Sequence, residues 1–351
     1  MCMRLSTDAI RSLPWQLAGA AGGDDDAVTG RLRALRRLRP GPADEPARMA
    51  GVAYELGEQE LSYADILGVQ GTLSRHGLHD DPELWGFGRF RRTQRDPAEL
   101  ALASMRRTLA LSGAEAGDID AVVLCSVVFP SGVRAQRELA HRILDGLAVH
   151  SVPLMGLTMS RCATLACGLR MADDLLASQR YRTILVASCD AVSDESDRVE
   201  PFAIFSDAAA SCLLSSTPGE GFELLHTVQA SQSTASDSDG PDAGGRLAAR
   251  ANRQLEDAGL APRSLHKVFH DNLFKPIVSL REQLAGFGPG QLYLDNISAI
   301  GHCFGCDPLI NLADYCRTSR PQEGALLGLF SSTPGVRTGV VLRTPGRPAR
   351  H

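Results

Sequence analysis

The stretch that decides the fold is TMSRCATLACGLRMADDLLASQRYRTILVASCD, residues 158–190. It overlaps an apolar, strand-like segment at 152–160, and its first part, 162–179, carries apolar residues at the spacing of a helix. Its second part, 181–190, is an apolar run typical of a buried strand. The order strand, helix, strand predicts an α/β unit in which Cys162 lies where the first strand turns directly into the helix.

The same alternation continues in both directions from this unit. We expect strands at 49–57, 119–128, 266–272, 324–332 and 338–344, and helices at 98–113, 135–148, 246–260, 274–287 and 307–320. The last two strands are expected to form a closing hairpin or strand pair. The small polar run 231–245 predicts a loop or linker. It divides the chain into two halves in which strands and helices alternate in a similar order.

The composition is typical of a large globular protein. The chain has 351 residues, of which 44% are hydrophobic, and a formal charge of −5. The mild acidity argues against a nucleic-acid binder, and the longest apolar runs, such as 121–128, are far shorter than the roughly 20 residues that span a bilayer. The first residues lack the continuous apolar stretch of a secretory signal. We therefore expect a cytoplasmic protein with neither a nucleic-acid nor a membrane partner.

Residues 1–48 differ from the rest, because glycine, proline and charged residues dominate them. Such a composition packs poorly, so we expect a poorly ordered N-terminal extension. Its Arg-rich run 31–40 could be a basic amphipathic helix for a partner or a membrane surface. A solvated short helix and an upstream start-site artefact are the alternatives.

The nine cysteines are irregularly spaced and are expected to be reduced thiols. Cys162 stands out because a thiol at a helix N-terminus is stabilised as thiolate by the helix dipole and the unpaired N–H groups. A buried structural thiol is the alternative, and it is the interpretation we adopt for the strand residues Cys125, Cys189 and Cys212. The pair Cys303 and Cys306 has the spacing of metal ligands, but no second pair accompanies it, so no metal site is expected.

Two histidines also lie at the ends of predicted elements. His270 follows an apolar strand in VFHDNLFKPI, and His302 lies in the glycine-flanked turn of NISAIGHCFGCDPLINL. Ligand sites of α/β sheets gather at the carboxyl ends of strands. One cysteine and two histidines in such places predict a nucleophile with its acid–base partners.

These motifs together resemble the β-ketoacyl-acyl carrier protein synthase III-like branch of the thiolase superfamily, over about residues 49–345. The nucleophile segment 158–190, the AIFSDAAASCLL of 203–214 and the DIDAVVLCSVVFPSG of 118–132 carry the resemblance. It implies a thiolase-like five-layer α-β-α-β-α fold with two related halves and a homodimer through the N-terminal half. The first half, 49–230, would hold the nucleophile, and the second, 246–351, the catalytic histidines.

The resemblance also assigns roles to site residues. Cys162 matches the nucleophile, and His270 matches the histidine of the family's H-Q-A-N motif, although the text here, His270-Asp271-Asn272, is one residue shorter. His302 stands where the family has an asparagine, and it would donate a hydrogen bond to an enolate oxygen. Asn296 is a rival alignment for that asparagine.

Three further positions depart from the family's pattern. Asn272 is a candidate for substrate binding, displaced by the shortened motif. Ser332, in the FSSTPG of 330–335, stands where a glycine-rich loop supplies a backbone N–H to the oxyanion hole. Arg161, beside the nucleophile, could lower the thiolate pKa, pair with a substrate carboxylate or face solvent.

The resemblance implies a condensing enzyme of polyketide, fatty acid or other specialised metabolism. Cys162 would take an acyl group from acyl-CoA or an acyl carrier protein and condense it with a malonyl thioester, with no tightly bound cofactor. The alternative is an acyltransferase that passes the acyl group to a hydroxyl or amine without forming a C–C bond. A third hypothesis, a non-catalytic partner in a heteromeric synthase, is disfavoured because Cys162 and both histidines are present.

Overall fold

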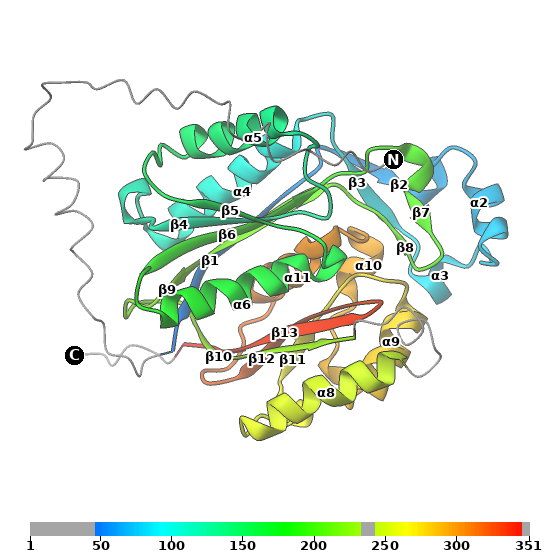
Figure 1. Ribbon diagram of the computed structural model, residues 1–351. Helices are drawn as coiled ribbons and strands as arrows, with labels where there is room; N and C mark the ends of the chain where they lie inside the picture. Colours follow the sequence, from blue (N-terminus) through cyan, green and yellow to red (C-terminus); the bar gives the residue numbers. More distant parts are fainter. Residues whose placement is uncertain (1–45, 233–242, 346–351) are drawn as a thin grey trace, which may run out of the picture. The chain divides into compact units, whose positions relative to one another are not determined.

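The computed structural model describes residues 46–232 and 243–345. Within them, nine strands form one sheet in the order β11-β12-β13-β10-β1-β9-β6-β4-β5 (Figure 1). The strands of the N-terminal half are β1 (Arg48–Leu56), β4 (Ala121–Cys125), β5 (Leu154–Leu157), β6 (Thr183–Asp190) and β9 (Ala208–Ser215). Those of the C-terminal half are β10 (Phe222–Ser231), β11 (Lys267–Phe269), β12 (Leu326–Thr333) and β13 (Val336–Arg343).

The two halves of the sheet repeat one pattern. In the first, β1 is antiparallel to β9, β9 is antiparallel to β6, and β6 is parallel to β4. In the second, β10 is antiparallel to β13, β13 is antiparallel to β12, and β12 is parallel to β11. A parallel bridge between Val268 and Leu292 lies where β5 lies in the first half. The halves join through a short contact in which Arg48 and Met49 pair with Glu223 and Phe222.

Helices complete five layers (Figure 1). On the outer face of the first half lie α4 (Pro97–Ser112) and α5 (Val133–Gly146), and on that of the second lies α8 (Ala243–Asp257). Between the halves lie α6 (Thr164–Ala177) and α11 (Asp307–Thr318), each in contact with strands of both. The expected α-β-α-β-α architecture is therefore confirmed.

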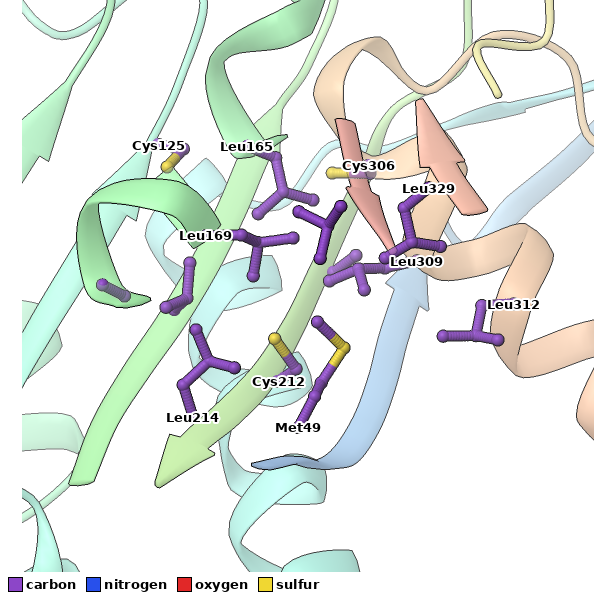
Figure 2. Packing of buried hydrophobic residues seen from close by; sticks show 14 of the residues in the cluster. Met49, Cys125, Leu165, Leu169, Cys212, Leu214, Cys306, Leu309, Leu312 and Leu329 are labelled. Carbon is purple, nitrogen blue, oxygen red and sulfur yellow. The ribbon is translucent and has the colours of Figure 1, made fainter. Parts of the chain in front are cut away.

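The central layer holds the largest cluster of buried apolar side chains. Figure 2 shows Leu165 and Leu169 of α6 close to Leu309 of α11 and Leu329 of β12. The helix can lie close to β4 because residue 168 is a glycine, where a Cβ would meet the Cys125 Sγ at 2.5 Å. Residues 164–169 of α6 are all buried, which explains why the first half of this helix is apolar around its circumference rather than along one stripe.

A set of short elements had no counterpart among the predicted ones. It comprises β2 (Gln59–Ser62), η1 (Tyr63–Asp65), α2 (Val69–Arg75), α3 (Pro82–Trp85), β3 (Arg89–Arg92), β7 (Val199–Glu200), β8 (Ala203–Ile204) and α10 (Asp295–Ala299). A separate apolar cluster that includes Phe87, Phe90 and Phe274 holds much of this set together. α9 (Lys275–Leu284) packs against both α3 and α8.

One expected boundary is wrong. The predicted linker 231–245 overlaps regular structure, because β10 includes Ser231 and α8 already begins at Ala243. The strand expected over 324–332 is confirmed as β12, which runs to Thr333, so that only Pro334 and Gly335 form the turn to β13. A Pro-Gly pair suits that tight turn, since Gly335 has φ 83°. The extension expected over 1–48 falls outside the described residues except for 46–48.

No helix among the described residues is long and apolar enough to cross a membrane.

Leu309→Ala should destabilise the protein by about 2–5 kcal/mol, because it leaves a cavity in the central layer where the leucine is fully buried. The matched change Leu284→Ala, at a side chain that is 72% exposed, should alter stability by less than about 0.5 kcal/mol. Urea unfolding midpoints compare the two. Equal effects would mean that α11 is not packed in the core.

Candidate active site

Cys162 lies in a single 3₁₀ turn, Arg161–Ala163, that leads into α6. The expectation that the strand turns directly into the helix is therefore wrong, because residues 158–160 separate the end of β5 from this turn. Met159 (φ 72°) and Arg161 (φ 52°) have left-handed backbone, which is strained for side chains of this size. Such strain clusters at functional sites, where it fixes the direction of a side chain.

His302 is held from both sides by backbone hydrogen bonds. Its N–H donates to the carbonyl of Ile204, and its carbonyl accepts from the N–H of Ser206, each at 2.8 Å. The preceding Gly301 has φ 85°, and a Cβ there would lie 2.9 Å from the Ile204 carbonyl oxygen. The ring packs against Phe205, with ring centroids 4.9 Å apart. These contacts leave the imidazole little freedom to rotate.

The imidazole of His302 joins Cys162 to a carboxylate that the sequence analysis did not single out. Its Nε2 lies 3.2 Å from the Cys162 Sγ, and its Nδ1 lies 2.5 Å from the Asp307 Oδ2. His302 and Asp307 are fully buried, while Cys162 is partly exposed. Thiol, imidazole and carboxylate in this order form a nucleophile–base–orienter triad.

The charges of this triad favour a protonated imidazole. Burial alone would lower the pKa of His302, but the neighbouring Cys162 and Asp307 outweigh it and raise that pKa well above its ordinary value. In the protonated form, Nε2–H donates to the sulfur and Nδ1–H donates to Asp307. The arrangement is therefore suited to a thiolate–imidazolium pair.

Asp307 is fixed by the surrounding backbone. Its Oδ1 accepts from the Cys303 N–H at 2.7 Å, and its Oδ2 accepts from the Asn272 N–H at 2.6 Å. The Asn272 side chain donates to Asp307 and to the Gly301 carbonyl, and its own oxygen accepts from Asn311. Asn272, predicted to bind substrate, therefore lies beneath the triad and supports it.

His270 occupies a different place from the one expected. It is fully buried, and its Nδ1 lies 2.9 Å from the carbonyl oxygen of Asp271. Its Nε2 has no hydrogen-bond partner among the described residues, and burial lowers its pKa. It is not among the residues that line the cavity holding Cys162 and His302.

That cavity, of about 370 Å³, is lined by both polar and apolar groups. Asp271, Arg281, Arg337 and Ser332 stand on its wall with Cys162 and His302, and Phe202, Leu247 and Leu273 are apolar neighbours. The 3₁₀ turn that carries Cys162 contacts β12, the strand of Ser332. Nucleophile, base and several charged groups thus share one small space.

The Ser332 N–H, which the resemblance assigns to the oxyanion hole, already has a partner. It donates to the Asp271 Oδ2 at 2.9 Å. Burial raises the pKa of Asp271, against the opposing effect of Arg281, whose Nη2 lies 3.7 Å from the same oxygen. A side chain of the protein therefore takes up the N–H that the resemblance assigns to the oxyanion.

The remaining candidates lie apart from the triad or at its edge. Arg161 is exposed at the mouth of the cavity, and it makes no ion pair within the described residues. Asn296 donates to Asn311 and Asp314 and does not line the cavity. Cys303 and Cys306 are buried free thiols, and no cluster of residues suited to a metal ion occurs in 46–232 or 243–345.

Two site residues were missed in the sequence analysis, Asp307 and Asp271. The position of Asp307 in the sequence could have identified it, because it ends the motif GHCFGCD at the start of a predicted helix, where an acidic residue is favourable. The sequence evidence for Asp271 is weaker: it is an acidic residue within the shortened H-D-N motif.

Comparisons with known proteins agree with this fold. A profile described as 3-oxoacyl-[acyl-carrier-protein] synthase III matches residues 158–233. The β-ketoacyl-[acyl-carrier-protein] synthase III of Rickettsia canadensis is 29% identical over 124 residues, which are 33% of this chain and 36% of that protein. The match thus spans about a third of the length of this curated relative.

Solved structures extend the similarity to nearly the whole described chain. 3-Oxoacyl-(acyl carrier protein) synthase III from Pseudomonas aeruginosa superposes with a TM-score of 0.70 at 19% identity, covering 86% of this chain and 99% of that one. A protein named ChlB3, described as an acyltransferase, gives 0.73 at 16% identity, covering 86% and 98%. At these identities the likeness concerns the fold.

Asp307→Asn should lower the pKa of His302, because it removes the carboxylate that stabilises the imidazolium. The His302 ring signals, followed by NMR against pH, measure this. Asp295→Asn, at an exposed acid nearby in the chain, is the control. An unchanged titration of His302 in Asp307→Asn would contradict the proposed charge pairing.

Proposed function

The chain is a ketoacyl synthase III-like member of the thiolase superfamily, and on that premise we propose that it is an acyltransferase. Cys162 carries the acyl group as a thioester and passes it to a hydroxyl or amine of a small molecule. The acyl donor is a thioester of coenzyme A or of an acyl carrier protein, and no tightly bound cofactor takes part.

The observation that carries this proposal is the position of His302 between Cys162 and Asp307. An imidazole in contact with both the nucleophile and a carboxylate can return and remove a proton at the sulfur. A group that only stabilised an enolate would have no need of Asp307. The geometry therefore favours proton transfer at the sulfur over the donor role that the resemblance alone gives to His302.

In the first step the Cys162 thiolate attacks the carbonyl carbon of the donor thioester. The C–S bond to the donor thiol then breaks, and protonated His302 gives its Nε2 proton to the leaving thiolate. The products are a free donor thiol, acyl-Cys162 and a neutral His302. The N–H of Cys162, which makes no hydrogen bond within the described residues, is available to the oxyanion.

In the second step the acceptor attacks the carbonyl carbon of acyl-Cys162. Neutral His302 takes the proton from the attacking oxygen or nitrogen as the new bond forms. The bond to the Cys162 sulfur breaks, and the thiolate–imidazolium pair is restored. Asp307 stabilises the imidazolium at that moment, which lowers the barrier to the transfer.

Decarboxylative condensation is the second candidate, and the match to ketoacyl synthase III over residues 158–233 supports it. That reaction needs donors on both sides of the enolate oxygen. The cavity has His302 on its wall, but His270 is absent from it and Asp271 is present. A carboxylate would repel both the malonyl carboxylate and the enolate, so this candidate ranks second.

Other properties follow from the family and are proposals. We infer a homodimer, a cytoplasmic location and a place in polyketide or other specialised metabolism, where acyl groups are transferred to finished molecules. The charged cavity wall, with Arg161 at its mouth, supports a dedicated substrate rather than the general fatty acid cycle.

Intact-protein mass spectrometry with a panel of acyl-CoA and acyl carrier protein donors tests the proposal. Labelling should occur at Cys162 and be lost in Cys162→Ala, while Cys316→Ala, which removes another partly exposed thiol, should be labelled normally. His302→Ala should slow both acylation and transfer, each by about 10²–10⁴-fold, because it removes the acid and the base.

The same donors, supplied with malonyl-CoA or malonyl carrier protein, distinguish the two candidates. The expected result is acyl transfer to alcohols or amines without carbon dioxide release. Release of carbon dioxide that matches formation of a ketoacyl product would show that condensation is the reaction.

A further inference from the structure

Two buried polar atoms on the cavity wall lack partners. The Asp271 Oδ1, an acceptor, and the Arg281 Nη2, a donor, each have no hydrogen bond within the described residues. Both residues line the cavity that contains Cys162 and His302. Buried polar groups are usually satisfied, so an unpartnered acceptor and an unpartnered donor on two residues of one cavity wall need an explanation.

The rest of each side chain is firmly held. The other oxygen of Asp271 accepts the Ser332 N–H, and the Asp271 side chain is 1% exposed. Arg281 donates through Nε to Glu282 at 2.8 Å and through Nη1 to the Ser332 carbonyl at 3.3 Å. Its Nη2 lies 3.7 Å from the Asp271 Oδ2, too far for a hydrogen bond. The two side chains are therefore fixed in place, while one polar atom of each stays unpaired.

We propose that Asp271 and Arg281 bind the acceptor of the acyl group, and that this acceptor is a neutral alcohol. The inference rests on the proposed function and narrows it from a hydroxyl or amine to a hydroxyl. A hydroxyl is both a donor and an acceptor, so it can donate to the Asp271 Oδ1 and accept from the Arg281 Nη2 at once.

Other functional groups satisfy only half of this pair. An ammonium group has donors only, so it leaves the Arg281 Nη2 unpaired and meets the positive charge of Arg281. A carboxylate has acceptors only, and Asp271 repels it. Arg337 donates two hydrogen bonds to Glu282, of 3.2 and 2.7 Å, which balance its charge. Arg337 therefore contributes little to the preference for one acceptor group over another.

The bound hydroxyl is the attacking one, and Asp271 and Arg281 act by binding it. Its O–H donates to Asp271 as the alcohol binds and turns to the Nε2 of neutral His302 as the oxygen attacks. The O–H proton then passes to His302, the oxygen forms the ester bond, and the thiolate of Cys162 leaves. Atoms and charge balance without a further reactant.

The first test compares matched acceptors on acyl-Cys162 prepared from an acyl-CoA donor. Benzyl alcohol and cyclohexylmethanol should hasten deacylation at least tenfold more than benzylamine and cyclohexylmethylamine. Asp271→Asn, whose amide oxygen can still accept the Ser332 N–H, should lower the alcohol-dependent rate at least tenfold more than it lowers acylation. Asp173→Asn, a half-buried acid outside the cavity, is the matched control.

Two results of this test would overturn the inference. One is faster transfer to the amines than to the alcohols. The other is an Asp271→Asn variant in which acylation and transfer fall by the same factor, which indicates a merely structural role.

A second measurement does not depend on acyl transfer. Benzyl alcohol should slow alkylation of Cys162 by iodoacetamide, benzylamine should not, and Asp271→Asn or Arg281→Met should remove the protection. Protection that is unchanged in both variants contradicts the inference. If both variants lose the protection but the wild type transfers no acyl group to alcohols, the result supports the alcohol-binding site and contradicts the proposed function.

Discussion

The carboxylate of Asp307 is the group on which the site depends. Standing in the first turn of α11, it joins the imidazole of His302, the backbone of Cys303 and the backbone and side chain of Asn272. These partners come from three segments: the start of a central helix, the turn before it and the residues that follow β11. An acidic group is favourable at this helix end, where the dipole is positive. One buried charge therefore fixes the base and couples the site to the central layer.

The cavity shows how the same fold can support different chemistry. The chain shares its fold with the 3-oxoacyl-(acyl carrier protein) synthase III of Pseudomonas aeruginosa. The polar groups around the sulfur, however, are an imidazole with its own carboxylate, a second carboxylate and an arginine. Since function depends on the groups at the site rather than on the fold, these charges are the better guide to the reaction.

Much of the architecture could be predicted from the sequence. The alternation of strand-like and helical segments predicted the strands of the sheet and the central helices. The glycine-flanked turn identified His302 as a candidate site residue. The segments between 58 and 97 gave no periodic signal, because their elements are only a few residues long and are held by tertiary contacts. Asp307 could have been found from its place at a helix start, but its contact with His302 depends on a turn whose path the sequence does not reveal.

The histidine of the H-D-N motif shows where sequence comparison fails. In β11, Val268 packs in the cluster beneath α8, and Phe269 packs in the central cluster. β11 ends at Phe269, and of the two residues that follow it, Asp271 lines the cavity and His270 does not.

The most direct test of the central claim, that Cys162, His302 and Asp307 act as one acyl-transfer unit, is a double-mutant cycle. Single-turnover transfer from acyl-Cys162 is measured in the wild type, His302→Ala, Asp307→Asn and the double variant. If Asp307 acts through His302, the double variant should be about as slow as His302→Ala alone. Losses that multiply would mean that the two residues act independently, and the triad would then be wrong.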